Sequence, residues 1–290
     1  MTRIKIVSPA KSMEKNHIDY AIQFLEKHNF EVSISENCLG QHHYFSGTDR
    51  ERLTDFQNAL DDNSIDVILC ARGGYGCIRI IDELDFRNFI KQPKLIIGFS
   101  DVTVFHNHIH TNFNLPTVHA SMPLNFNDNS IESLQSLVDV IDGKQLKYDF
   151  ESHLLNQNGE ANAVVAGGNL AIIYALIGTN SDLNLDNKIL FIEDVGEHIY
   201  AIDRMMWALK KSGKLKKIVG LIVGGLTNIN DTDTPFGKTV EQVILDSVSH
   251  LNIPVCFNFP AGHIDDNRAV VLGEMASLSV NERGVVYEQY

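Results

Sequence analysis

The sequence has little that would place it in a membrane or on nucleic acid. Its 290 residues contain no apolar run near the ~18 residues that a transmembrane helix needs. Basic residues are outnumbered, with 24 lysines and arginines against 37 aspartates and glutamates, and the formal net charge is -13. An acidic field of this kind repels phosphate backbones and anionic lipid surfaces. We therefore expect neither a nucleic-acid partner nor a membrane partner.

The sequence also has no closely paired cysteines, and its first residues do not predict a signal peptide. Cys38, Cys70, Cys77 and Cys256 lack the CxxC spacing of a structural zinc site, which predicts reduced and mostly buried thiols. The amino-terminal segment has no apolar core of a signal peptide, and its run Ile4–Val7 predicts a strand instead. These features predict a cytoplasmic protein.

Short apolar runs alternate with amphipathic stretches in the first half of the chain, a pattern typical of a parallel sheet covered by helices. Thr48 and Glu51 have the spacing of a capping box at the start of one such helix. The strands are expected at Ile4–Val7, Val67–Cys70 and Leu95–Gly98.

A polar stretch separates the two halves. Residues 125–160 are rich in Asn, Asp, Ser and Gln around one expected helix, Ile131–Ile141, and predict a linker between domains 1–124 and 161–290. The second half is expected to contain a helix at Ala166–Ile177, strands at Lys188–Ile192 and Ile218–Val223, and closing antiparallel strands at Val270–Leu272, Ser277–Val280 and Val285–Tyr290. The fold class predicted is α/β: an N-terminal domain with a parallel sheet and helices on both faces, and a smaller mixed α/β C-terminal domain that ends in antiparallel strands.

A candidate nucleophile follows the strand Leu95–Gly98. The chain continues as Phe99-Ser100-Asp101 directly before an expected helix, which is the layout of a nucleophile elbow. Val102 occupies the position where the commonest elbow has its second glycine. The alternative is that Ser100 only caps the helix.

A glycine-rich turn, Ala71–Gly76, directly follows the strand Val67–Cys70. Glycines at the carboxyl end of a parallel strand let the backbone pass close to a ligand. The turn lacks both the GxGxxG order of a dinucleotide loop and the Lys-Ser/Thr ending of a phosphate loop, so nucleotide binding is disfavoured. A plain turn is the other interpretation.

Two ionisable residues stand at the ends of short apolar runs, Glu193 and His263. A serine hydroxyl becomes a good nucleophile when an imidazole accepts its proton and a carboxylate orients the imidazole. Ser100, His263 and Glu193 fit these roles, although their spacing in sequence leaves open whether they meet. The alternatives are a surface charge at Glu193 and a structural turn residue at His263.

A metal site is disfavoured. His106 and His110 share one face of the expected helix, but no glutamate directly follows His106, as a zinc-hydrolase motif would require.

Taken together, these segments resemble the LD-carboxypeptidase family of serine peptidases, which also includes the microcin C immunity peptidases. Any one segment is weak, but their joint occurrence in this order is specific. The segments are Ile4–Ala10, Phe45–Leu60, Ala71–Gly76, Gly98–Thr103, Gly167–Leu170, Glu193–Arg204 and Gly262-His263.

The resemblance implies a two-domain homodimer without metal or other cofactor, whose active site lies at the domain junction. Carried over by position, it implies Ser100 as nucleophile, His263 as base and Glu193 as the carboxylate that orients it. It further implies an oxyanion hole made by the backbone N–H groups of Gly74 and Asp101. The stretch at 119–123 departs from the family's His-Gly-Pro, which leaves the shape of that loop open.

The implied reaction is hydrolysis of the bond that joins an L-residue to the C-terminal D-alanine of a murein tetrapeptide during cell-wall recycling. One alternative is hydrolysis of peptidyl-aminoacyl nucleotides, as in microcin C immunity, which the lack of an obvious inserted aromatic loop disfavours. A non-catalytic muropeptide-binding module is a second alternative, and the presence of all three triad residues disfavours it. A flavodoxin-like nucleotide-binding domain is the third.

Overall fold

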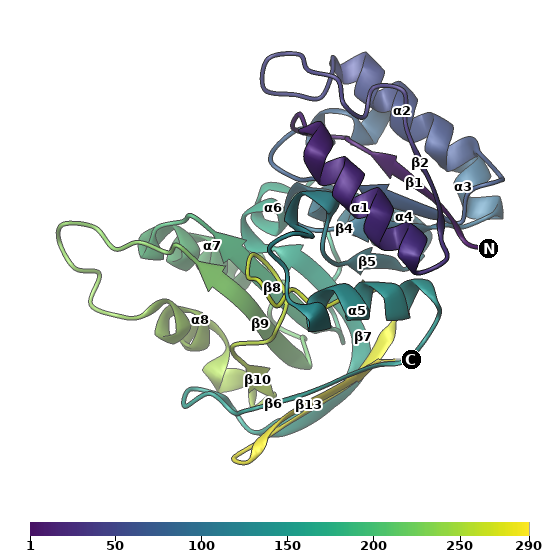
Figure 1. Cartoon of the computed structure of the whole chain (residues 1–290). Coiled ribbons are helices and arrows are strands. Elements are labelled where there is room, and N and C mark those ends of the chain that lie inside the picture. The colour runs from purple at the N-terminus through teal and green to yellow at the C-terminus, as the bar shows by residue number, and fades with distance from the viewer. Residues whose placement is uncertain (290) are drawn as a thin grey trace.

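The protein is described by a computed structural model, and the structure describes residues 1–289. Two β-sheets with flanking helices build the molecule (Figure 1). The expected strand Val285–Tyr290 includes one residue, Tyr290, that lies outside the described range. None of the helices in residues 1–289 combines the length and the apolar character that crossing a bilayer requires.

The first sheet has six strands, and its five amino-terminal ones are parallel. Only β11, from the far end of the chain, runs antiparallel, beside β5. In spatial order the strands are β11 (Val270–Leu272), β5 (Thr117–His119), β4 (Leu95–Gly98), β3 (Val67–Cys70), β1 (Arg3–Val7) and β2 (Glu31–Ile34).

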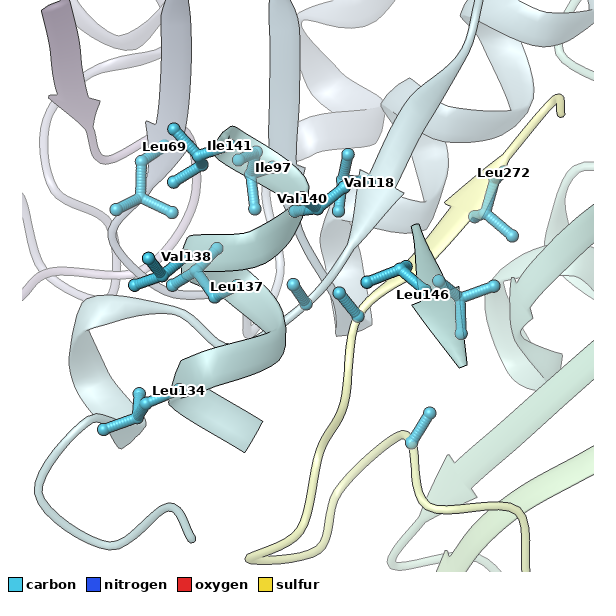
Figure 2. Packing of buried hydrophobic residues seen from close by; sticks show 14 of the residues in the cluster. Leu69, Ile97, Val118, Leu134, Leu137, Val138, Val140, Ile141, Leu146 and Leu272 are labelled. Carbon is cyan, nitrogen blue, oxygen red and sulfur yellow. The ribbon is translucent and has the colours of Figure 1, made fainter. Parts of the chain in front are cut away.

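Helices cover both faces of this sheet, as the alternation of side chains along β3 shows. Leu69 packs in a cluster with residues of α1 and α5, and Figure 2 shows it near Val138 of α5. Ile68 and Cys70 point to the opposite face, toward α2, α3 and α4. A strand buried on both faces is continuously apolar, as β3 and β4 are. These helices span α1 (Lys15–Lys27), α2 (Asp49–Asp61), α3 (Arg87–Lys91), α4 (Thr103–Phe113) and α5 (Ile131–Ile141).

The second sheet joins a parallel half to an antiparallel half. In spatial order its strands are β10 (Val255–Cys256), β9 (Gly220–Thr227), β8 (Ile189–Val195), β7 (Gly159–Asn169), β12 (Met275–Asn281), β13 (Gly284–Gln289) and β6 (Leu146–Phe150). An apolar cluster joins one face to α6 (Leu170–Ala175), α7 (Ile199–Lys211) and α8 (Val240–Val248). The predicted α/β class is confirmed; the second sheet has seven strands and the first has six.

One expectation about the second half needs correction. The helix expected over Ala166–Ile177 is wrong in its first part, because β7 continues to Asn169 and only Leu170–Ala175 is helical. Gly167 and Gly168 have φ of 143° and 130°, which breaks a helical path.

The segment 125–160, expected to be a linker, contributes to the packed structure. It contains α5 and also β6, which pairs with β13 in the second sheet. The division into domains 1–124 and 161–290 therefore stays a prediction.

Short 3-10 turns connect several elements, at η1 (Cys77–Arg79), η2 (Ile81–Glu83), η3 (Ser100–Val102), η4 (Pro123–Asn125) and η5 (Ser249–Leu251). The loop after β10 connects the two sheets. It leaves the second sheet, spans residues 257–269 and enters the first sheet as β11. One loop therefore joins both sheets.

Candidate active site

The turn after β4 holds Ser100 in an unusual backbone conformation. Phe99 is extended, and Ser100 follows with a φ of 63° before η3 and α4 begin. This left-handed region is sparsely populated by residues other than glycine, and nucleophile elbows use such a strained turn. Ser100 makes no side-chain cap at the start of η3 or α4. The interpretation of Ser100 as a helix cap is therefore wrong.

The glycine-rich turn after β3 packs directly against this serine. A Cβ placed on Gly73 would lie 2.9 Å from the Cβ of Ser100 and 3.0 Å from its Oγ, so only glycine fits there. Gly74 follows with a φ of 106°. Among the hydrogen bonds of residues 1–289, none uses the backbone N–H of Gly74 or Asp101. Two backbone N–H groups without a hydrogen-bond partner in the described chain therefore lie on the adjoining turns after β3 and β4.

Glu193 and His263 meet, although seventy residues separate them in sequence. Glu193 lies near the end of β8 and is fully buried, and its Oε2 is 2.6 Å from Nδ1 of His263. Gly262 permits this approach, because a Cβ there would lie 2.8 Å from the Cβ of Glu193. The carbonyl of His263 accepts a hydrogen bond of 2.7 Å from Thr227 Oγ1 of β9.

The electrostatics of the pair favour an ionised carboxylate. Burial opposes the charge on Glu193, but the neighbouring His263 outweighs it and the pKa of Glu193 is lowered. Burial likewise opposes a charged imidazole, and Glu193 outweighs it so that the pKa of His263 is raised. The carboxylate therefore accepts from Nδ1–H and directs Nε2 of the imidazole away from itself.

The serine turn is docked onto the second sheet beside Glu193. Asn169 pairs with Glu193 in the parallel register of β7 and β8, and its backbone N–H donates to Oγ1 of Thr103 at 3.0 Å. The ring of Phe99, adjacent to Ser100, lies 4.8 Å from the ring of His263. Within the described chain, no hydrogen bond joins the hydroxyl of Ser100 to His263. In structures without substrate, such catalytic contacts are often long and tighten on binding.

Two supporting residues escaped the sequence analysis. Asn267 is fully buried, and its Oδ1 accepts from the N–H of Gly262 at 2.7 Å and lies 3.3 Å from Nε2 of His119. Its position four residues after His263 carries no local signal that distinguishes it from a surface asparagine.

Asp194, the second acid after β8's apolar run, was also missed. It turns away from His263 and accepts hydrogen bonds from the side chain of Asn169 and the N–H of Ala171. Burial first, and then the charge of Glu193, raises the pKa of Asp194 to about 6. Asp194 therefore fixes the start of α6.

Two histidines of α4, His106 and His108, have structural hydrogen-bond partners. His106 is buried, with Nδ1 2.8 Å from Oγ1 of Thr117 and Nε2 2.9 Å from the carbonyl of Gly98, and burial lowers its pKa to about 3. His108 contacts Ser181. The described residues contain no group of three or more His, Cys, Asp or Glu side chains that could hold a metal ion.

Comparisons with known proteins cover nearly the whole chain. The pattern of an LD-carboxypeptidase N-terminal domain matches residues 4–120, and that of an LD-carboxypeptidase C-terminal domain matches residues 162–278. The probable murein peptide carboxypeptidase of Bacillus subtilis is 31% identical over 98% of this chain and 91% of its own. The murein tetrapeptide carboxypeptidase of Pseudomonas aeruginosa is 28% identical over 96% of this chain and 94% of its own.

Solved structures agree in fold. The crystal structure of muramoyltetrapeptide carboxypeptidase from Oxalobacter formigenes has a TM-score of 0.90 at 26% identity and covers 99% of this chain and 98% of its own. The microcin C7 self-immunity protein MccF shares the fold, with a TM-score of 0.87 at 20% identity, over 98% of this chain and 95% of its own. By sequence and by fold, the chain belongs to the LD-carboxypeptidase family.

Proposed function

We propose that this protein is a serine carboxypeptidase that removes the C-terminal D-alanine from murein tetrapeptides. Relatives along the whole chain carry the names murein peptide and murein tetrapeptide carboxypeptidase, and a similar solved structure is a muramoyltetrapeptide carboxypeptidase. The observation that carries the proposal is the 2.6 Å hydrogen bond between buried Glu193 and His263, beside the strained turn of Ser100.

In the first half of the reaction, Oγ of Ser100 attacks the carbonyl carbon of the L-residue, and Nε2 of His263 accepts the hydroxyl proton. The charge that develops on the carbonyl oxygen is stabilised by the backbone N–H groups of Gly74 and Asp101. Glu193 holds the imidazole by Nδ1–H and stabilises its positive charge. The imidazolium then protonates the amide nitrogen, the C–N bond breaks, and D-alanine leaves.

In the second half, water attacks the acyl-serine. His263 accepts a proton from the water and returns one to Oγ of Ser100, which releases the tripeptide with a new carboxylate. Each step uses only side chains and backbone donors of this chain and one water molecule. The proposal therefore names no cofactor.

Replacing the nucleophile tests the assignment. We expect Ser100→Ala to lower the rate of D-alanine release from a purified tetrapeptide by a factor on the order of 10⁴ or more. Its melting temperature should match that of the wild type, because the change removes one partly exposed oxygen atom. A Ser100→Ala protein with full activity contradicts the proposed nucleophile.

A parallel assay addresses the rival activities. A microcin C7 self-immunity protein is 24% identical over 98% of this chain, so a peptidyl-aminoacyl nucleotide is the natural second substrate. Turnover of that conjugate without release of D-alanine from the tetrapeptide would replace our proposal. A wild-type protein that binds the tetrapeptide without turnover would indicate a binding module.

We also propose that the enzyme acts in the cytoplasm as a homodimer on a small muropeptide. The resemblance to the family supports both points. Sedimentation of the purified protein measures the oligomeric state, and fractionation of cells measures the location.

A further inference from the structure

Arg72 is a partly buried cation without a carboxylate partner, on the glycine-rich turn beside Ser100. One of its terminal nitrogens donates to the carbonyl of Ser12 at 3.0 Å, and its Nε is buried and has no hydrogen-bond partner. Within residues 1–289, no aspartate or glutamate lies within ion-pair distance of it. A buried donor that is left unpaired costs free energy, so its retention needs an explanation.

Among the arginines that are not exposed, Arg72 differs from the others because it has no ion-pair partner. The arginines that are not exposed are Arg52, Arg72 and Arg268. Arg52 is paired with Asp49 and Arg268 with Asp266. The chain has 37 acidic residues and a formal net charge of -13, yet none of its described carboxylates lies close enough to Arg72 to form an ion pair.

The surroundings of Arg72 lie next to the candidate oxyanion hole. A Cβ placed on Gly74 would lie 3.0 Å from Cβ of Lys11 and 3.1 Å from the hydroxyl of Tyr44. The ammonium group of Lys11 lies 5.0 Å from the centre of the Tyr44 ring. Two cationic side chains therefore flank the turn whose Gly73 touches Ser100.

We propose that Arg72 binds the free carboxylate of the substrate's C-terminal D-residue and thereby restricts the enzyme to the last peptide bond. This inference rests on the proposed function. In such a substrate, only the amide nitrogen and one Cα separate the carbon of the scissile carbonyl from that of the terminal carboxylate, so three bonds with a total length of about 4.3 Å set the upper limit of the span. When the carbonyl oxygen lies at the N–H of Gly74, the carboxylate must therefore lie within a few ångströms of that turn.

The chemistry of the guanidinium suits this role. Its planar fork donates two parallel hydrogen bonds to one carboxylate, and such bidentate pairs are among the stronger hydrogen bonds in proteins. The bond to Ser12 fixes one nitrogen, while Nε remains to be satisfied. A bound carboxylate would supply the missing acceptor.

The test compares a tetrapeptide that ends in D-alanine with the same peptide ending in D-alaninamide. The wild type should prefer the acid in kcat/KM. Arg72→Gln should lower kcat/KM for the acid roughly 10- to 100-fold, the value of a charge-assisted hydrogen bond, and lower kcat/KM for the amide much less, because the neutral amide lacks the charge that pairs with the guanidinium. Arg72→Lys should keep part of the preference, because an ammonium retains the charge but not the fork.

Arg79→Gln is the matched control. Arg79 is also close to the glycine-rich turn, but it is exposed and paired with Asp49, so its loss should leave the preference for the acid as in the wild type. Melting temperatures check that each variant is folded. Calorimetry with Ser100→Ala protein, with and without Arg72→Gln, measures the same difference as binding without turnover.

Two results would overturn the inference. One is an Arg72→Gln enzyme that keeps the full preference for the acid. The other is a preference that Lys11→Gln abolishes while Arg72→Gln does not, which would assign the carboxylate to Lys11. In either case the wild type still releases D-alanine, whereas a wild type that releases none refutes the proposed function itself, and the inference falls with it.

Discussion

Glu193 carries its charge in a fully buried position, and His263 provides the compensation. Burial alone would raise the pKa of a carboxyl group in such a place. The imidazole reverses that effect for Glu193, and the carboxylate in turn raises the pKa of His263. The two side chains thus set each other's protonation state, and the pH dependence of activity reports on the pair.

Glu193→Gln should separate the charge of this side chain from its shape. The imidazole acts as a base only when neutral, so wild-type kcat/KM should rise with pH through the raised pKa of His263, above the ordinary value of ~6.5. Without the carboxylate, the pKa of His263 falls, so the rise of kcat/KM with pH (the acid limb of the profile) should move to lower pH. The maximal rate should drop by roughly 10² to 10⁴, because the tautomer is less well fixed.

The control for this profile is Asp194→Asn. Asp194 also titrates in the acid range, with a pKa of about 6, but it is not the partner of Nδ1. Its loss should move the acid limb much less than Glu193→Gln does. Equal shifts in the two variants would contradict the role assigned to Glu193.

Among the structural elements, the turns after β3 and β4 act as one unit. Oδ2 of Asp101 accepts a hydrogen bond of 2.8 Å from the N–H of Cys77, which ties η3 to η1. Arg52 adds a second tie, because its guanidinium donates to the carbonyls of Gly76 and Pro9 at 3.0 and 2.6 Å. Hydrogen bonds from the side chains of Asp101 and Arg52 to the backbone therefore stabilise the two turns that carry the candidate oxyanion donors, the N–H groups of Gly74 and Asp101.

Asp101→Ala removes the first tie but keeps the backbone N–H. We expect kcat to fall by up to about 10² with little change in KM, since a misplaced oxyanion donor weakens mainly the transition state. Asp101→Asn keeps an acceptor for Cys77 and should lose less. Steady-state kinetics on the tetrapeptide measure both variants, and equal losses in kcat would show that the hydrogen bond to Cys77 is not what matters.

The sequence predicted elements well where the signal is local. Val67–Cys70, Leu95–Gly98 and Ile131–Ile141 have the predicted limits, because continuous apolar runs and a strong amphipathic period define them. The last residues of β7, from Ala166 to Asn169, were misread as part of a helix, and β6 was not recognised within a polar stretch. Their strand character comes from pairing with β12 and β13, which no local window contains.

The candidate site was likewise predictable from the sequence only where the signal is local. Ser100 and the glycines beside it follow a strand that the sequence identifies, so their chemistry was open to prediction. The contact between Glu193 and His263 depends on where two distant segments settle, and only the structure gives it. Asn267 was missed because its role is to hold the backbone of Gly262, a function that leaves no local pattern.

At the scale of the whole molecule, the two sheets share a hydrophobic core. One cluster of buried side chains includes Ile97 and Val118 from the first sheet and Phe191 and Phe259 from the second half. Domains joined by a large apolar contact lose their independence. The halves of this protein should therefore unfold together.

Urea unfolding tests this expectation. Trp207, the single tryptophan, lies on α7 beside the second sheet, so its fluorescence reports on that half, whereas far-UV circular dichroism reports on both. The two transitions should coincide with one midpoint. A first step seen by circular dichroism alone would mean that the first sheet unfolds separately.

The loop that carries His263 is anchored at one end by β10 in the second sheet and at the other by β11 in the first. Any hinge opening between the halves would pull on this loop from both sides and withdraw the base from the nucleophile. The position of the base therefore depends on the packing of both sheets, and activity should be lost in the same urea transition in which the two sheets unfold.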